Sequence, residues 1–247
     1  MATLVFEYSQ IAGCDRLVET LRDHGHRMNI VRLHQGDPVP ASLKNVDAVI
    51  TCGGPFNVQD NPDWLEPQMD LLRQANALAL PIVGICLGCQ ILAKALGGEV
   101  GELENGKQIG WHELKLNHIG REDPIYAGID WKSMQANWNS QCVTKLPDGA
   151  RILASSEKCP VEAWAMGLRT YGLQYHPEIY ADTFSKWAAD DPKGLEEVDI
   201  SCEDLSRQTE MLFPTFERLS KRLFESIALL VMPVDRRYQG VVKDLHH

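Results

Sequence analysis

The sequence predicts an α/β fold: a doubly wound, mainly parallel sheet with helices on both faces and an antiparallel extension. Three observations predict it. Short apolar runs alternate with helical patterns through the first hundred residues, as in strands joined by right-handed crossovers. Beyond residue 106, strand-like runs follow one another without long helices between them, as in hairpins. Hydrophobic residues make up 44% of the 247, which is enough for a sizeable core.

The first hundred residues contain four expected strands and three expected helices. β-Branched and aromatic residues fill the strands, and the helices carry apolar residues at three- and four-residue spacing. Pro62 precedes the second helix as a start signal, and Gly97 with Gly98 stops the third. We expect strands at residues 3–8, 29–33, 46–52 and 81–85, and helices at residues 15–24, 63–80 and 87–96.

The rest of the chain predicts short strands and one long helix. Strands are expected at residues 109–117, 140–146, 151–156, 161–166 and 170–176. An amphipathic helix is expected at residues 203–231, and Pro214 is expected to start it afresh or kink it. Because no repeat or linker interrupts the pattern, we expect one domain over residues 1–247.

Composition excludes several classes of protein. The net charge of −10 argues against a nucleic-acid partner, because phosphate binding needs a cationic surface. No run of 18 apolar residues and no signal-like start is present, so we expect a cytoplasmic protein without a membrane partner. The seven cysteines are scattered and odd in number, so a disulfide framework is not expected and most should be reduced. We draw no conclusion from the closing pair His246 and His247.

One cysteine stands at a strand-to-helix turn. Cys86 follows the run at residues 81–85, and Gly84 and Gly88 on either side let the backbone make a tight turn. The helix that starts just after it presents free N–H groups, which favour a thiolate and can hold an oxyanion. Two alternatives remain open: a buried cysteine that only packs, and a redox pair formed with Cys89.

A cysteine nucleophile needs a base that also protonates the leaving amine, and this base needs an orienting carboxylate. His176 ends an apolar strand, Pro177 turns the chain, and Glu178 lies two residues after His176.

A second donor for the oxyanion could come from the loop after residues 46–52. There Gly53 and Gly54 let backbone N–H groups approach a ligand closely, although an ordinary turn would look the same.

Together these segments resemble the class I, triad-type glutamine amidotransferases. The match rests on Gly53-Gly54-Pro55, on "GICLGCQ" at residues 84–90 and on "YHPE" at residues 175–178. The stretches "QIGWHELKL" and "ILASSEKCPVEAW" are similar to the free-standing branch related to the glutaminase domain of GMP synthase. The resemblance implies a flavodoxin-like sheet and leaves little chain for a second catalytic domain.

The resemblance also implies roles for particular residues. The catalytic residues would be Cys86 as nucleophile, His176 as general base and then acid, and Glu178 as its orienter. Gly54 and Leu87 would donate N–H groups to the oxyanion, with Gly53 beside them. Gln90 would help to hold the γ-glutamyl group.

One segment departs from the family pattern. Where the related enzymes carry a Trp-His-Gly-Asp-like segment beside the substrate, this chain reads Asn137-Trp138-Asn139-Ser140-Gln141. Losing the carboxylate there argues against free glutamine as the substrate. If only backbone groups matter at this loop, the change is neutral. Both interpretations stay open, and Asn137, Trp138 and Asn139 are expected to be substrate-binding.

The leading hypothesis is therefore hydrolysis of a γ-glutamyl amide through a Cys86 thioester, with a small-molecule γ-glutamyl substrate. One version passes ammonia to a separate synthetase subunit, and the other cleaves γ-glutamyl conjugates alone. The sequence predicts neither a metal nor a cofactor. The alternatives are a non-catalytic interaction protein that uses the acidic surface or the helix at residues 203–231, and the Cys86–Cys89 redox pair.

Overall fold

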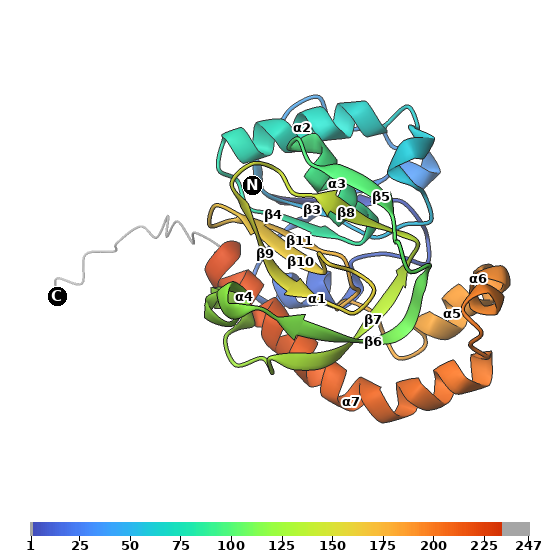
Figure 1. Ribbon diagram of the computed structural model, residues 1–247. Helices are drawn as coiled ribbons and strands as arrows, with labels where there is room; N and C mark the ends of the chain where they lie inside the picture. The colour runs from blue at the N-terminus through green and yellow to red at the C-terminus, as the bar shows by residue number, and fades with distance from the viewer. Residues whose placement is uncertain (1, 234–247) are drawn as a thin grey trace, which may run out of the picture.

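A nine-stranded sheet forms the centre of the computed structural model, which describes residues 2–233 of the chain (Figure 1). The strands in sheet order are β2 (Met28–Arg32), β1 (Ala2–Glu7), β3 (Val46–Thr51), β4 (Ile82–Ile85), β11 (Thr170–Leu173), β10 (Ala163–Met166), β9 (Ala150–Ser155), β6 (Gln108–Leu116) and β7 (Lys132–Asn139). A separate antiparallel pair is formed by β5 (Glu99–Glu102) and β8 (Gln141–Lys145).

The strand directions confirm the predicted mixed sheet. The five strands from β2 to β11 pair in parallel, in the order β2, β1, β3, β4 and β11. From β11 onward the pairs are antiparallel, through β10, β9, β6 and β7. The parallel half needs crossover helices, whereas the antiparallel half is joined by shorter connections.

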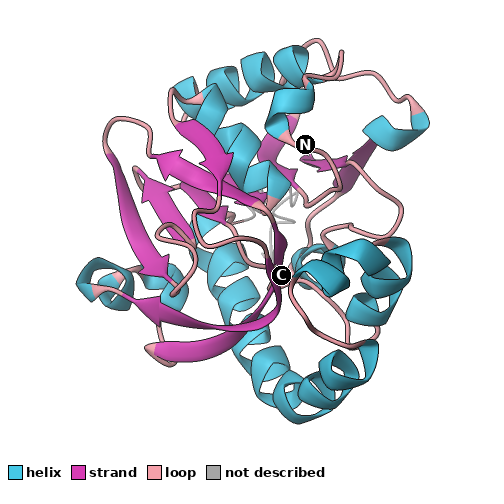
Figure 2. Cartoon of the chain, turned by 45° about the vertical axis from the view of Figure 1, so that its right-hand side comes forward, coloured by secondary structure: helices cyan, strands magenta, loops and turns pink. Residues whose placement is uncertain are grey.

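Helices cover both faces of the parallel half (Figures 1 and 2). One face carries α2 (Leu65–Ala77) and α3 (Leu87–Ala95), and the other carries α1 (Asp15–Asp23) and α7 (Cys202–Ser226). This arrangement buries both faces of the strands, which explains why the strand sequences are apolar at nearly every position.

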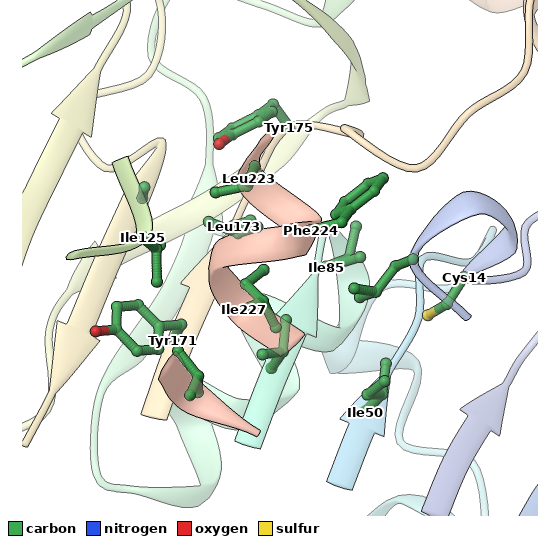
Figure 3. Close-up of a cluster of buried hydrophobic side chains, with 14 of the residues drawn as sticks. Cys14, Ile50, Ile85, Ile125, Tyr171, Leu173, Tyr175, Leu223, Phe224 and Ile227 are labelled. Carbon is green, nitrogen blue, oxygen red and sulfur yellow. The ribbon is translucent and has the colours of Figure 1, made fainter. Parts of the chain in front are cut away.

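Successive side chains along each strand point to opposite faces of the sheet, and this divides the core into two layers. Val5 and Ile50 face the side of α1 and α7, whereas their neighbours Leu4 and Val49 face α2 and α3. Figure 3 shows the first layer, in which side chains of α7 such as Leu223 lie against the strands. The two layers hold the strands in register, and so they hold the strand ends that carry the candidate site.

The sequence allowed Pro214 either to start the last helix afresh or to kink it, and the structure excludes the first of these. The helix α7 neither ends nor restarts there; it runs through the proline, and a short π-helical turn at Ile227–Val231 follows it. The ribbon bends along its length (Figure 1). A proline removes one backbone hydrogen bond, but packing of Phe216 and Leu219 on the core keeps the helix together. No helix within residues 2–233 is both long and apolar enough to cross a lipid bilayer.

Several short elements were not expected from the sequence. They are the strands β5 and β7 and the helices α4 (His118–Glu122), α5 (Thr183–Asp190) and α6 (Pro192–Glu197). Short 3₁₀ turns also occur at Leu33–Gln35, Val58–Asp60 and Pro124–Tyr126. The strand β7 matters most, because residues 137–139 form its end and are not a loop. The closing pair His246 and His247 lies outside the described residues.

One disulfide was not expected from the sequence. Cys14, which precedes α1, is bonded to Cys52, which directly follows β3. The two cysteines are 38 residues apart in the sequence, but β1 and β3 are neighbours in the sheet, so their following loops meet. The other five cysteines are free thiols, as expected for most of the seven. The disulfide therefore ties the start of α1 to the first residue of the glycine loop.

Candidate active site

The candidate site lies at the carboxyl edge of the parallel strands. The strand β4 pairs with β3 on one side and with β11 on the other, all in the same direction. The segments that follow these three strands therefore meet at one edge of the sheet. They carry Gly53 and Gly54 after β3, Cys86 after β4, and His176 after β11.

Cys86 occupies a strained turn between β4 and α3. Its φ of 50° and ψ of −110° place a non-glycine residue in the left-handed half of backbone space. The backbone N–H of Cys86 donates to Leu173 on β11 at 2.7 Å, which holds the turn against the sheet. Since Cys86 caps α3, its sulfur lies at the positive end of that helix.

Two glycines make this turn possible by close backbone approach. A Cβ atom on Gly84 would lie 2.6 Å from the Gly88 carbonyl oxygen. A Cβ atom on Gly88 would lie 2.1 Å from the carbonyl oxygen of Thr51 at the end of β3. Any side chain at either position would push α3 away from the sheet, so the Gly-x-Cys-x-Gly pattern has a packing reason as well as a chemical one.

His176 is buried beside Cys86 and bonded to Glu178. The distance from His176 Nδ1 to Glu178 Oε1 is 2.7 Å, and both side chains are almost fully buried. The backbone N–H of His176 donates to Ala136 on β7 at 2.7 Å, and the Trp187 ring packs edge-on at 4.7 Å between centroids. Burial by itself lowers the pKa of His176. The Cys86 sulfur and the Glu178 carboxylate together outweigh it and raise this pKa to about 10.

The glycine loop touches the other two segments. A Cβ atom on Gly53 would lie 2.7 Å from Cε1 of His176 and 3.6 Å from Cβ of Cys86. A Cβ atom on Gly54 would lie 3.1 Å from Leu87 Cδ2. Within residues 2–233, the N–H groups of Gly54 and Leu87 donate to no backbone carbonyl. Both N–H groups are therefore open to an acceptor near the Cys86 sulfur, as an oxyanion hole requires.

A cavity of about 360 Å³ opens over these residues. Cys86, His176, Gly54, Leu87 and Gln90 line it, and so do aromatic and charged groups from other segments. The aromatic and charged ones are Phe56, Lys107, Trp138, Trp187, Asp190 and Asp191, and the carboxamides Asn139 and Gln141 also line the cavity. The cavity therefore combines the Cys86 sulfur and the His176 imidazole with a lysine and two aspartates. This combination suits a ligand that carries charges of both signs.

Carboxamide side chains form the wall of this cavity on the side of β7 and β8. Asn139 donates to the Gln141 backbone oxygen at 3.0 Å, and Gln141 donates to Glu102 at 2.7 Å. The remaining side-chain oxygens of Asn139 and Gln141 are buried without a hydrogen-bond partner within the described residues. Asn137 does not line the cavity; its amide donates to the buried carboxylate of Glu162 at 3.2 Å. Trp138 and Asn139 do reach the cavity.

Sequence reasoning did not assign Trp187, Asp191 or Gln174 to the site. The first two lie on and after the unexpected helix α5, and the folded chain brings them over the site from about 100 residues beyond Cys86. Gln174 interrupts the apolar run "TYGLQYH" next to His176, and this polar residue in a buried strand was an available signal. Its amide approaches the Cys86 sulfur at 3.7 Å.

Cys89 is held in a different environment from Cys86. It is fully buried, the Trp164 indole N–H donates to its sulfur at 3.1 Å, and burial raises the pKa of its thiol far above the usual range. Such a thiol stays protonated and is shielded from solvent, which disfavours dithiol redox chemistry with Cys86. Within residues 2–233, no three His, Cys, Asp or Glu side chains gather as metal ligands would.

Comparison with known proteins agrees with this geometry. The family model "Glutamine amidotransferase class-I" matches residues 12–190. One subunit of the glutamine-hydrolysing GMP synthase of Archaeoglobus fulgidus is 35% identical over 166 residues, which cover 67% of this chain and 82% of that protein. The longer GMP synthase of Azoarcus is 33% identical over 158 residues, which cover 60% of this chain and only 29% of that protein.

A solved structure supports the fold alone. The glutamine amidotransferase of Methylobacillus flagellatus superimposes with a TM-score of 0.87 and 23% identity, over 96% of this chain and 98% of that one. The family match includes Cys86, His176, Glu178 and the glycine loop, and it confirms the resemblance inferred from the motifs. The chain belongs to the class I glutamine amidotransferase family.

Proposed function

We propose that this protein is a cysteine-dependent amidohydrolase that cleaves a γ-glutamyl amide bond through a thioester on Cys86. The observation that carries the proposal is the meeting of Cys86 and His176 in the wall of one cavity, with Glu178 hydrogen-bonded behind the imidazole. Nucleophile, base and orienting carboxylate are the three groups that acyl transfer from an amide needs.

The first half of the reaction transfers the glutamyl group to the enzyme. The Cys86 sulfur forms a bond to the γ-carbonyl carbon while His176 holds the proton that came from the thiol. The negative charge that develops on the carbonyl oxygen is stabilised by the N–H groups of Gly54 and Leu87. His176 then gives its proton to the leaving nitrogen, the carbon–nitrogen bond breaks, and ammonia or an amine departs.

The second half releases the glutamyl group by hydrolysis. His176 takes a proton from a water molecule, and the water oxygen attacks the thioester carbon. The carbon–sulfur bond breaks, the proton returns to the sulfur, and glutamate leaves. Glu178 keeps the same imidazole nitrogen facing the reacting atoms in both halves, because a carboxylate can only accept the Nδ1 proton.

The charged residues of the cavity support a glutamyl substrate. Lys107, which forms an ion pair with Glu197 at 2.8 Å, would exchange this partner for the α-carboxylate of the substrate. Asp190 and Asp191 offer anions for the α-ammonium group, although both oxygens of Asp191 also accept hydrogen bonds, from Trp138 and from the Gly194 backbone. The volume of about 360 Å³ lies within the range of pockets that hold drug-sized ligands, roughly 300–1,000 Å³. We therefore include γ-glutamyl conjugates with a larger leaving amine among the substrates, beside free glutamine.

The relatives suggest a partner for the glutaminase version of this function. The similar archaeal protein is named as one subunit of a glutamine-hydrolysing GMP synthase. In that version, this chain passes ammonia to a separate synthetase subunit. In the second version, it hydrolyses γ-glutamyl conjugates without a partner. Asn139 and Gln141 stand where the related enzymes carry the His and Asp of the Trp-His-Gly-Asp-like segment, and the loss of that carboxylate favours the second version.

The experiment that tests the function is covalent labelling with a glutamine-mimicking electrophile, diazo-oxonorleucine, followed by intact-protein mass measurement. We expect one adduct on the wild type, no adduct on Cys86→Ser, and an unchanged adduct on Cys202→Ser, which removes an exposed free thiol. Labelled wild type with no turnover of glutamine or of any γ-glutamyl amide would contradict hydrolysis. Turnover that survives in Cys86→Ser would contradict the nucleophile.

Turnover assays then separate the two versions. Glutamine and γ-glutamyl amides with larger amines are offered to the chain alone and together with the synthetase component of a GMP synthase. Conjugate hydrolysis without the partner supports the autonomous version. Glutamine hydrolysis that rises strongly only with the partner supports the ammonia-transfer version and overturns the autonomous one.

A further inference from the structure

A line of buried carboxamides connects β8 with the Cys86 sulfur. The Gln90 amide nitrogen donates to the Gln141 backbone oxygen at 2.9 Å and to the Gln174 side-chain oxygen at 3.1 Å. The Gln174 amide nitrogen in turn donates to the Cys86 sulfur at 3.7 Å. Gln90 is 4% exposed and Gln174 is fully buried, so water does not compete for these bonds.

The direction of these hydrogen bonds is determined by the chemistry of the groups. A backbone carbonyl can only accept, so Gln90 must turn its NH₂ group toward Gln141. The same NH₂ group reaches Gln174, which must therefore present its oxygen to Gln90. The NH₂ group of Gln174 is left facing the sulfur. Reversing any one carboxamide would place two donors or two acceptors against each other.

A donor that faces the sulfur distinguishes the two protonation states of Cys86. A thiolate accepts this N–H, and a charge-assisted hydrogen bond is stronger than a neutral one. The thiol gains less from it, and the Cys86 thiol proton has the Trp138 carbonyl oxygen as its acceptor at 3.9 Å. The fixed amide therefore favours the reactive form of the sulfur.

We propose that Gln174 is a further residue of the catalytic centre, which donates to the Cys86 sulfur and stabilises the thiolate, and that Gln90 positions it. This role rests on the proposed function of Cys86 as nucleophile. Gln90 touches both the Gln141 carbonyl and Gln174, so it sets the direction of the Gln174 amide. With both amide hydrogens used inside the protein, Gln90 acts through Gln174.

The test is the pH dependence of Cys86 alkylation by iodoacetamide in the full chain, read by peptide mass. Gln174→Met keeps the side-chain length and removes the donor. We expect the midpoint of the alkylation profile to move about one to two pH units higher, which is the effect of losing one hydrogen bond to a charged group. Gln135→Met is the matched control, because Gln135 is similarly buried but donates to Ser133 and not to the site.

A second variant tests the proposal if Gln174→Met does not fold. Gln90→Met releases the Gln174 oxygen from its donor, so the amide can rotate and the midpoint should move in the same direction by a smaller amount. Circular dichroism and thermal unfolding identify which variants are folded. An unchanged midpoint in either folded variant, or an equal movement in Gln135→Met, overturns the proposal.

The alkylation experiment can fail or succeed independently of the proposed hydrolysis, because iodoacetamide reacts with the sulfur without needing a glutamyl pocket. If the wild type turns over γ-glutamyl amides and the folded variants alkylate with the wild-type profile, Gln174 has no role in thiolate stabilisation and the function stands. If the midpoints move as expected but no γ-glutamyl amide is cleaved, the role of Gln174 stands and the substrate class is wrong.

Discussion

Glu178 accepts a hydrogen bond from His176, with 2.7 Å between Oε1 and Nδ1. Only one residue, Pro177, stands between the two in the chain. The proline turns the backbone so that the carboxylate returns to the imidazole of its near neighbour. This contact fixes the proton on Nδ1 and leaves the other ring nitrogen for the sulfur and the leaving group. The proposed catalytic pair is thus built within three consecutive residues.

Replacing the carboxylate by an amide should therefore impair catalysis without unfolding the protein. In Glu178→Gln the amide can donate to Nδ1, which selects the wrong tautomer of His176. We expect kcat to fall by about 10³–10⁴-fold, as for other triads that lose the orienting carboxylate. Steady-state kinetics with a γ-glutamyl amide measure it. A loss of less than tenfold in a folded variant contradicts the role of Glu178.

The pH profile of the wild type should report the raised pKa of His176. Because this pKa is raised to about 10, the imidazolium that protonates the leaving amine is present below pH 10 and lost above it. The basic limb of kcat/KM should lie near pH 10, and in Glu178→Gln it should move to lower pH. A wild-type basic limb near the ordinary histidine value would contradict the raised pKa of His176.

Gly53→Ala should damage the site by direct contact. The added Cβ atom would lie 2.7 Å from His176 Cε1, so the imidazole must move. A displacement of about 1 Å in a catalytic group can cost on the order of 10²-fold in rate. We expect a loss of that size in kcat, with the fold retained in circular dichroism.

The matched control for Gly53 is Gly101→Ala. At this position in β5, the new atom meets the side chain of Thr144, with its methyl group at 3.1 Å. Activity of this variant should equal that of the wild type. An equal loss in both variants would mean that general strain, and not the contact with His176, causes the effect.

Asp15 should make stability depend on pH. Burial and the nearby Glu178 carboxylate raise its pKa to about 6. An acid with a raised pKa destabilises the folded state when ionised, so the penalty is full above pH 6 and fades as pH falls toward the unfolded value of 3.8. Urea unfolding should show Asp15→Asn to be more stable than the wild type at pH 8 and nearly equal to it at pH 4.

The control for Asp15 is Asp148→Asn, at an exposed turn far from the site. This variant should follow the wild type at both pH values. Equal stability of Asp15→Asn and the wild type at pH 8 would show that the Asp15 carboxylate is well solvated.

The disulfide between Cys14 and Cys52 should be measurable in the unfolded chain. Without reductant, a thiol-reactive dye in denaturant should count five thiols, and with reductant all seven. A bond that closes a loop of this length contributes about 2–4 kcal/mol to the free energy of unfolding. Cys14→Ala with Cys52→Ala should lower the stability by that amount. Seven thiols without reductant would contradict the bond.

The parallel core was predictable because its signals are local. Each strand from β1 to β4 is a short apolar run, and each helix between them has its own periodicity and stop residues. The short antiparallel elements were harder. The strand β7 does alternate apolar and polar residues, but its polar side chains, such as Gln135 and Asn137, are the buried ones. Amide side chains are poor strand formers, and the Glu162 carboxylate that binds Asn137 comes from another part of the chain, so the local pattern did not reveal the strand.

The sequence by itself determined the proposed reactive centre, which consists of Cys86 between two glycines and of His176 with Glu178, because each group is built within a few consecutive residues. The tertiary structure decided what surrounds them. It brought Trp187 and Asp191 over the cavity, joined Cys14 to Cys52, and turned the Gln174 amide toward the sulfur through Gln90 and Gln141. These contacts depend on which strands and loops become neighbours, and that is settled by packing of the whole sheet and not by any local pattern.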